Sequence, residues 1–363
     1  MAKINVGFIG MGNVASAVVQ GIQFYRENNG EDGTVMHNEL GGYKISDIEV
    51  TSGFDIASNK VGKTIDKAIM QNPNYFRLLK PKLNKHKVKL APVLDSVGKY
   101  VEKMIDPINR DEDIEGLEKN IIREIKETKT EVLVNTLPVG SQKATEFWAN
   151  IAIKTKTAMV NAIPVFIAST PQWAERFSKA GIPIVGDDIK SILGATVVHR
   201  VLSKLTVDRG AKLEQTYQLN VGGNTDFKNM LERERLESKK ISKTESVQSQ
   251  FGTRLDTDNI HIGPSDYVPF LRNTKIAFIY LRGKMWCNIP YEMDVKLTVN
   301  DKADAAGVLV DAIRLCKIGL DHKLSGPLVE ASAYLMKHPP MQKSDSEAKI
   351  ELETFIHKYA HKN

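Results

Sequence analysis

The sequence predicts an α/β fold built on a doubly wound parallel sheet that opens with a glycine turn between a strand and a helix. In the first half of the chain, short apolar runs alternate with helical patterns. Strands separated by helices pair in parallel through right-handed crossovers. After about residue 200 strand-like segments follow one another, and helical patterns return from Ala305. The second part therefore contains a mixed or antiparallel sheet, and helices follow it.

The elements of the first part begin with a strand over 4–9, a glycine turn and a helix from Val14. Residues 27–43, rich in Asn, Gly, Glu and Asp, are expected to form a surface excursion. Apolar runs predict further strands over 47–51, 131–135, 158–161 and 182–185. Helical patterns predict helices from Ser58, near 96–105, and over 114–127, 141–154 and 171–180.

The elements of the second part are expected as strands over 213–219, 261–262, 274–282 and 293–298. Helices are expected over 307–317, 328–336 and 344–360. The highly charged segment 228–250 is expected to order when ligands bind, because it holds many candidate ligand groups and little apolar surface.

Composition excludes several classes of function. The 363 residues are 42% apolar, which is enough for two domains with buried cores. An apolar run of about 18 residues, as a membrane span requires, does not occur. The net charge of +6 is mostly lysine without interleaved aromatic residues, which argues against nucleic acid as a partner. Two cysteines, Cys287 and Cys316, indicate reduced thiols and a cytoplasmic protein.

The glycine turn predicts a dinucleotide site. Gly10 and Gly12 allow a tight turn and a close approach of the backbone to a pyrophosphate, and the following helix presents free N–H groups. Ala15 takes the third position of the fingerprint. Asp55 is the candidate for the ribose hydroxyls, which favours NAD over NADP. The alternative for Asp55 is a helix cap.

A second set of polar strings lies in the later part of the chain, and two of them, 186–191 and 220–226, follow strands, where α/β sheets bind their ligands. Its candidate groups are Asp188, Asn220, Asn224, Asp226, Lys239, Lys243, Lys275 and Lys337. Lys239 and Lys243 share one face if their segment is helical. Each lysine alone is more simply a solvated surface cation. Together beside a nicotinamide they could hold a phosphate and move protons next to a carbonyl. The residues thus indicate an NAD enzyme acting on an anionic, phosphorylated polyol or sugar.

Several strings resemble the inositol-1-phosphate synthase family in its shorter bacterial and archaeal form, over almost the whole chain. They are Gly10-Met-Gly-Asn-Val-Ala-Ser16, Leu137-Pro-Val-Gly-Ser141, Asn161-Ala-Ile-Pro-Val-Phe-Ile-Ala-Ser169, Gly186-Asp-Asp-Ile-Lys-Ser191, Leu219-Asn-Val-Gly-Gly-Asn-Thr-Asp226, residues 231–243, His261-Ile-Gly-Pro-Ser-Asp266 and Ser332-Ala-Tyr-Leu-Met-Lys337.

The resemblance implies a redox-neutral conversion of glucose 6-phosphate to 1D-myo-inositol 3-phosphate. C5 is oxidised by NAD, the ketone enolises by loss of a C6 proton, the enol carbon attacks the C1 aldehyde, and the remaining ketone is reduced. It assigns Lys239 to charge at the C5 oxygen, Lys337 to a reacting carbonyl, and Lys243 with Lys275 to the phosphate. The pocket residues that it implies besides these are Asn220, Asn224, Asp226, Asp188 and Asp301.

The resemblance also implies which residues bind NAD. They are Gly10, Gly12, Asn13, Val14, Asp55, Thr128, Trp148, Ser191, Asp226 and Lys239. It further implies a Rossmann domain over 1–200 completed by 305–363. The inserted α+β domain, 201–304, would carry catalysis and the contacts of a homotetramer.

One departure from the family pattern is Asn273, which stands where an acidic residue commonly precedes Lys275. Two alternatives stay open: a sugar-phosphate dehydrogenase with net NADH production, and a non-catalytic NAD-sensing protein. Whether an activating cation takes part, a divalent metal or ammonium, is also open.

Overall fold

The computed structural model describes residues 3–28, 34–95, 97–108, 113–232, 237–251, 254–263 and 266–360, with 237–240 described by their backbone alone. Its larger sheet has the strand order β14-β8-β7-β6-β1-β4-β5 with parallel pairs throughout. The strands are β1 Ile4–Ile9, β4 Ile48–Asp55, β5 Lys89–Leu90, β6 Val132–Asn135, β7 Ala158–Asn161, β8 Pro183–Gly186 and β14 Gly326–Pro327. This order, with a switch between β1 and β6, confirms the predicted Rossmann-type sheet.

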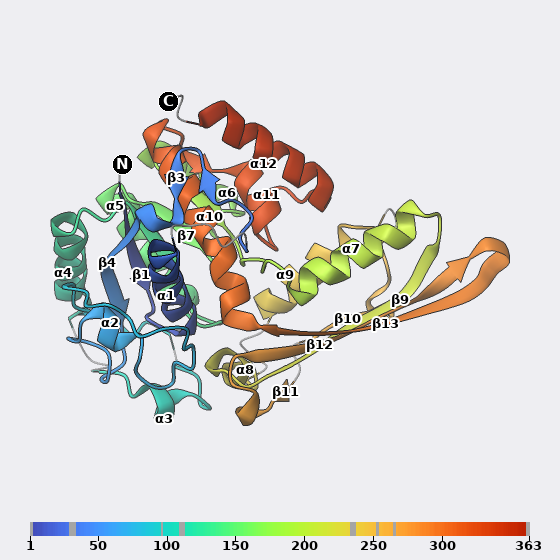
Figure 1. The fold of residues 1–363 in the computed structure, drawn as a ribbon, viewed down its shortest axis with the longest axis horizontal. Helices are drawn as coiled ribbons and strands as arrows, with labels where there is room; N and C mark the ends of the chain where they lie inside the picture. Colours follow the sequence, from blue (N-terminus) through green and yellow to red (C-terminus); the bar gives the residue numbers. More distant parts are fainter. Residues whose placement is uncertain are drawn as a thin grey trace.

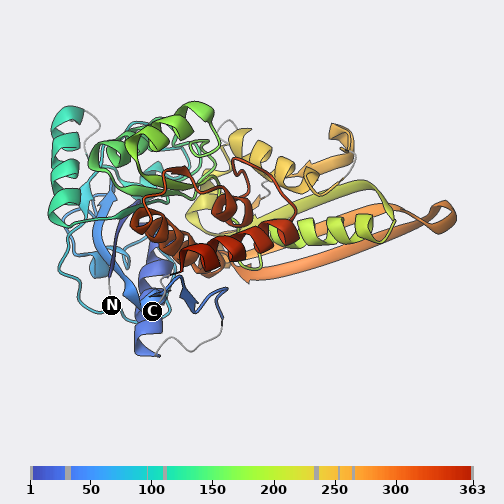
Figure 2. The ribbon, with the colours of Figure 1, turned by 90° about the horizontal axis from the view of Figure 1, so that it is seen from above.

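Helices cover both faces of this sheet (Figure 2). One face packs against α1 and α10, and the other packs against α5 and α6, with α4 beside α5. The helices are α1 Asn13–Glu27, α4 Ile114–Glu127, α5 Gln142–Thr155, α6 Pro171–Ala180 and α10 Asp301–Asp321. The strands between them are fully buried, which explains why their sequences read as continuous apolar runs.

The smaller sheet extends away from the Rossmann-type domain as an arm (Figure 1). Its path is β10-β9-β12-β13, with β11 beside β9. The strands are β9 Lys212–Gly222, β10 Ile260–Ile262, β11 Asp266–Tyr267, β12 Thr274–Met285 and β13 Ile289–Asn300. The hairpin of β12 and β13 pairs antiparallel along its whole length, and α7 Ala195–Asp208 packs against β9 and β12. The predicted mixed sheet is therefore present, with longer strands than expected.

The C-terminal part returns to the first domain. The helix α10 packs on β6, β7 and β8, and β14 adds a strand at the edge of the larger sheet. The remaining α-helices are α9 Glu237–Gln248, α11 Val329–Leu335, α12 Asp345–Tyr359, and the short α2 Ile65–Ala68, α3 Glu102–Ile105 and α8 Thr225–Asn229. The hairpin of β2 Glu39–Leu40 and β3 Tyr43–Lys44 completes the described elements.

Two expectations about local structure are wrong. The helix predicted from Ser58 is a series of turns, because the Asp55 carboxylate binds the next two backbone N–H groups and Gly62 takes a φ of +80°. The helix near 96–105 is only the short α3. In the surface excursion expected over 27–43, residues 29–33 lie outside the described residues, and the others are mostly exposed or half-buried, with Leu40 and Tyr43 buried against the core.

One helix, α7, was not expected. Its sequence contains Thr196, Val197 and Val198, and β-branched residues of this kind favour strands. The helix forms because it covers the buried face of β9 and β12, so tertiary packing overrides local preference. Across the described residues, no helix has the length and apolar character of a transmembrane span.

Candidate active site

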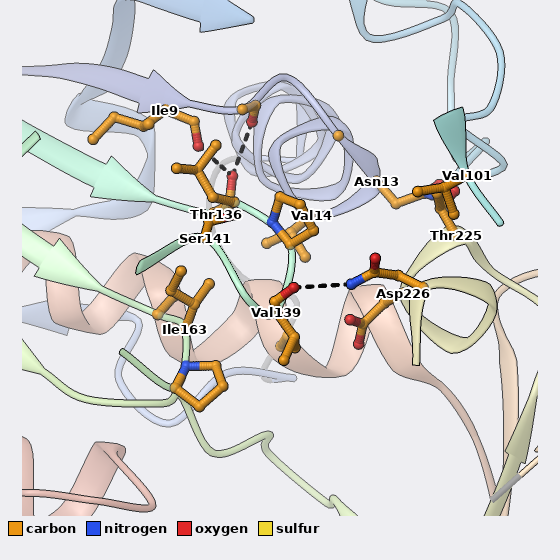
Figure 3. Close-up of a pocket in the computed structure, with 18 of the residues that line it drawn as sticks. Ile9, Asn13, Val14, Val101, Thr136, Val139, Ser141, Ile163, Thr225 and Asp226 are labelled. Atoms are coloured by element: carbon orange, nitrogen blue, oxygen red, sulfur yellow. Dashed lines mark hydrogen bonds between the residues drawn. The ribbon is translucent and has the colours of Figure 1, made fainter. Parts of the chain in front are cut away.

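The glycine turn joins β1 to α1 at one end of a large cavity. Gly10 has a φ of +87°, and its N–H donates to the carbonyl of Phe54 (2.8 Å). Gly12 caps α1 without a side-chain bond, and a Cβ on it would meet no atom within 4 Å. Asn13 and Val14 line the same cavity (Figure 3). The open space at Gly12 and the uncapped helix end fit the phosphates of a dinucleotide.

Asp55 ends β4 and lines the cavity with a carboxylate that is only 9% exposed. One oxygen, Oδ2, accepts the N–H of Met11 at 2.8 Å, and Oδ1 accepts the N–H groups of Ile56 and Ala57. Lys60 Nζ lies 3.4 Å from Oδ2. Asp55 thus braces the glycine turn and faces the cavity, and it does not cap a helix.

The apolar wall of the cavity comes from the sheet and from α5. Trp148 is 1% exposed, and its ring lies 4.8 Å from that of Phe54 between centroids. Ser191 also lines the cavity. Thr128 does not: it follows α4 near the amino end of β6, and its hydroxyl donates to the carbonyl of Glu124. Thr128 therefore lies near the amino ends of the parallel strands, whereas the glycine turn lies at their carboxyl ends.

A cluster of lysines and carboxylates lines the other end of the cavity. Lys337 Nζ lies 2.8 Å from Asp188 Oδ1 and donates to the carbonyl of Ile189 at 2.6 Å. Ser242 donates its hydroxyl to the other oxygen of Asp188 at 2.5 Å. Asp188 has a φ of +61°, a backbone strain that is typical of functional positions. Side chains from two distant segments, Ser242 and Lys337, thus contact the Asp188 carboxylate.

Asp301 joins a second group in this cluster. Its Oδ1 lies 3.6 Å from Lys275 Nζ, and its Oδ2 lies 2.8 Å from Lys302 Nζ and 3.2 Å from Asn224 Nδ2. Asp226 lines the same cavity (Figure 3). The Asp301 carboxylate therefore contacts two ammonium groups and one side-chain amide.

The helix α9 provides Lys243, which is 6% exposed and lines the cavity. Lys239 lies in the same helix, four residues before Lys243, but its side chain is outside the described residues. Asn220 is not among the lining residues: its Nδ2 donates to the carbonyl of Gly263 at 2.8 Å, and its Oδ1 accepts from Gln218. Asn220 therefore supports the loop beside the cavity from β9.

Two motif residues have structural roles. Asp187 is fully buried, and burial raises the pKa of its carboxyl to about 6 even though Asn161 and the loop 167–169 donate hydrogen bonds to it. Lys190 is buried against Asp345 and the carbonyl of Ala333, and burial lowers the pKa of its ammonium to about 8. Neither side chain belongs to the cavity wall in the described part of the chain.

Asn273 lies between the two ends of the site. Its Nδ2 is 3.5 Å from Asn13 Oδ1, an oxygen that also accepts the N–H of Tyr75. The side chain is 5% exposed, and its own Oδ1 has no hydrogen-bond partner in the described part of the chain. The neutral amide can donate to Asn13, which an ionised acid could not do.

Two residues of the site were missed by sequence reasoning. They are Ser242, which contacts Asp188, and Lys302, which contacts Asp301. A serine in a charged helix and a lysine near a helix start carry no distinguishing pattern. Only the position of Lys302 directly after a candidate carboxylate could have drawn attention to it.

Chains similar to this one were found by three comparisons. Residues 194–302 match the family model described as myo-inositol-1-phosphate synthase. The inositol-3-phosphate synthase of Mycolicibacterium smegmatis is 46% identical over 362 residues, with 98% of each chain covered. That of Mycobacterium tuberculosis is 46% identical over 358 residues, covering 98% of this chain and 96% of the relative. The solved inositol-3-phosphate synthase of Caenorhabditis elegans shares the fold, with a TM-score of 0.80 at 17% identity, over 99% of this chain and 86% of that one.

Fold and site together define a class, the Rossmann-type enzymes with a reaction site of lysines and carboxylates beside the glycine turn. Relatives that are 42–46% identical over nearly the whole chain are named inositol-3-phosphate synthase, which narrows this class to one family. The chain belongs to the myo-inositol-1-phosphate synthase family.

Proposed function

We propose that this chain converts D-glucose 6-phosphate to 1D-myo-inositol 3-phosphate as an NAD-dependent isomerase; its relatives carry the name inositol-3-phosphate synthase. The observation that carries the proposal is one continuous cavity. The same cavity is lined by Gly10 and Gly12 at one end and by Lys243, Lys275 and Lys337 at the other. A dinucleotide held at the glycines would therefore lie beside a cationic pocket suited to a sugar phosphate.

The residues at the first end fit NAD. Gly12 leaves open space, the first turn of α1 offers N–H groups, and Asp55 presents a carboxylate at the end of β4. A carboxylate at this place accepts ribose hydroxyls and repels a 2′-phosphate. When bound, NAD supplies reversible hydride transfer, which a redox-neutral isomerisation requires.

Lys337 is proposed to polarise a reacting carbonyl. An ammonium group has three N–H donors, and Asp188 and Ile189 accept two of them in the described part of the chain. The third is available to a substrate oxygen. Because Asp188 is itself fixed by Ser242, the ammonium is held in place before substrate binds.

Lys243 and Lys275 are proposed to bind the phosphate, and Lys239 to stabilise charge at the C5 oxygen. Lys243 and Lys275 are both largely buried at the cavity wall, where a low local dielectric strengthens their attraction for an anion. The Asp301 carboxylate orients the Lys275 ammonium and is itself held by a hydrogen bond from the Asn224 side-chain amide. Asp226 completes this wall beside them.

We also propose the division into a dinucleotide-binding domain, 1–200 with 305–363, and an inserted domain, 201–304, in a cytoplasmic homotetramer. One face of the arm packs on α7, and the opposite face exposes Leu219 and Phe278, which pair directly between β9 and β12. Tyr217 and Tyr280 stack on the same face. A continuous apolar face of this kind is typical of a subunit contact.

The oligomer is tested by sedimentation. Replacing Leu219 and Phe278 by Glu should convert a tetramer into smaller species, with the circular dichroism spectrum retained. A double variant that remains tetrameric would remove this face from the assembly.

The reaction is tested with glucose 6-phosphate and substoichiometric NAD, with the product followed by phosphorus NMR. Many turnovers for each NAD, without lasting absorbance of reduced nicotinamide, are expected. Stoichiometric NADH would support the dehydrogenase alternative instead. NAD binding without turnover would support the sensing protein.

A further inference from the structure

Lys302 is a lysine of the cavity wall to which neither the sequence motifs nor the family resemblance gives a role. Its side chain is 8% exposed and lines the same cavity as the glycine turn. Its Nζ lies 2.8 Å from Asp301 Oδ2. Lys302 is therefore a buried cation at the centre of the site and not a surface lysine.

The position of Lys302 is electrostatically costly. It belongs to the first turn of α10, where Asn300 caps the helix and accepts the N–H of residue 302. The positive end of a helix disfavours a cation there. Burial also lowers the pKa of Lys302, yet the carboxylates of Asp301 and Asp226 outweigh burial and raise it above its ordinary value. The side chain therefore stays charged, and it does so because of two carboxylates that line the cavity.

Asp301 shows what this charge does. Its Oδ2 faces Lys302 and Asn224, whereas its Oδ1 faces Lys275 at the longer distance of 3.6 Å. Without the Lys302 ammonium, a larger share of the negative charge of Asp301 would act on Lys275. Lys302 thus sets both the orientation of the Asp301 carboxylate and the share of its charge that reaches Lys275.

The same two carboxylates would be the natural ligands of an added cation in this cavity. Among the described residues, however, no three His, Cys, Asp or Glu side chains gather in a way that could hold a metal ion. The place beside Asp301 is taken by an ammonium group that belongs to the chain itself. The donor set at this wall therefore does not fit a metal ion.

We propose that the Lys302 ammonium is the cation that this site uses. Lys302 acts as a positioning residue that holds the Asp301 carboxylate in place, so that turnover needs no added metal or ammonium ion. This inference rests on the proposed synthase reaction. It concerns only which cation the site uses and not which reaction it performs.

The first test uses the wild-type enzyme. After treatment with a chelator and dialysis into sodium buffer, turnover of glucose 6-phosphate with NAD should be the same with and without added magnesium, zinc or ammonium. A tenfold or larger gain on adding any of them would overturn the proposal. If wild type forms no inositol phosphate under any of these conditions, the proposed reaction fails, and that outcome is distinct from cation dependence.

The second test uses Lys302→Ala, with Lys302→Arg to keep the charge and Lys349→Ala on the exposed face of α12 as the matched control. Loss of the orienting group should lower turnover by about 10- to 100-fold, as for other side chains that orient a functional group. Ammonium chloride should restore part of the loss in Lys302→Ala, whereas tetramethylammonium chloride, which is too large for the space, should not. Lys302→Arg should keep more activity than Lys302→Ala.

A readout without turnover completes the test. In the protein without ligands, ammonium chloride should raise the melting temperature of Lys302→Ala relative to sodium chloride at equal ionic strength, because an ion bound only by the folded state stabilises it. Wild type should show no such difference. A Lys302→Ala variant with normal turnover, or without any specific response to ammonium, would overturn the proposal.

Discussion

The Lys337 ammonium lies 2.8 Å from the carboxylate of Asp188, although 149 residues separate the two in the chain. Asp188 follows a strand of the larger sheet, and Lys337 follows α11. The backbones meet as well, because the N–H of Lys337 donates to the carbonyl of Asp188 at 2.7 Å. The ion pair is therefore fixed by both main chain and side chain, and its geometry exists before any substrate arrives.

Lys337→Ala should lower turnover by at least about 100-fold, the usual cost of removing a positioned electrostatic group. The affinity for NAD, measured by calorimetry, should change little, because the hydrogen bonds of Lys337 within the described residues go to Asp188 and Ile189 and not to the glycine turn. Lys349→Ala, on the exposed face of α12, serves as the control for loss of a lysine. Wild-type turnover in the Lys337 variant would exclude this lysine from the mechanism.

Lys275→Ala should raise the Michaelis constant for glucose 6-phosphate more than it lowers turnover. A phosphate is charged before and during reaction, and the loss of uniform binding appears in the Michaelis constant. Some loss of turnover is also expected, because a loosely held phosphate misplaces the reacting carbons. Steady-state kinetics at several substrate concentrations separate the two effects. An unchanged Michaelis constant would contradict the assignment of Lys275 to the phosphate.

Asp55→Ala should weaken NAD binding by about 1–3 kcal/mol, the loss expected for a charged hydrogen-bond partner. Part of this loss will come from the glycine turn, because the variant also removes the acceptor of the Met11 N–H. Asp55→Asn, which keeps one acceptor oxygen, separates the two contributions. Calorimetric titration with NAD is the measurement. Equal affinity in wild type and both variants would leave Asp55 with the bracing role alone.

His199 makes stability depend on pH. Burial lowers the pKa of this imidazole from 6.5 to about 4, which outweighs the opposite effect of the neighbouring Gln218 side chain. The unfolded chain therefore binds the proton first as pH falls, and the folded state loses stability from about pH 6.5 down to about pH 4, by roughly 3 kcal/mol in total. His199→Gln should flatten this loss. Denaturant unfolding at about pH 7 and about pH 5 compares the two proteins; parallel losses in both would show that His199 is not the cause.

The glycine turn and the alternating strands were predictable from sequence because their patterns are local. Gly10 and Gly12 follow a buried strand directly, and the structure has the turn there. Asp187 and Asn161 were visible as members of two separate motifs, but only the fold shows that one hydrogen bond joins them. Thr128 was assigned through resemblance, and the strand order places it away from the cavity.

What sequence could not provide was the set of contacts between distant segments. The proposed role of Lys302 depends on its interactions with two carboxylates, Asp301 beside it and Asp226 from α8. Similarly, α7 forms from residues that favour strands because the arm provides a surface for it. In both cases the decisive interactions are tertiary, and a single sequence does not show them.

The helix α10 has a consequence for how the protein is made. It covers the face of the larger sheet beside α1, although it comes after the whole arm in the chain. During synthesis the strands β1 and β4–β8 leave the ribosome before α10, and the part of their apolar face that α10 covers stays open until residues 301–321 have emerged. We expect nascent chains shorter than this to need a chaperone, and the first domain to become protease-resistant only after α10 has been translated.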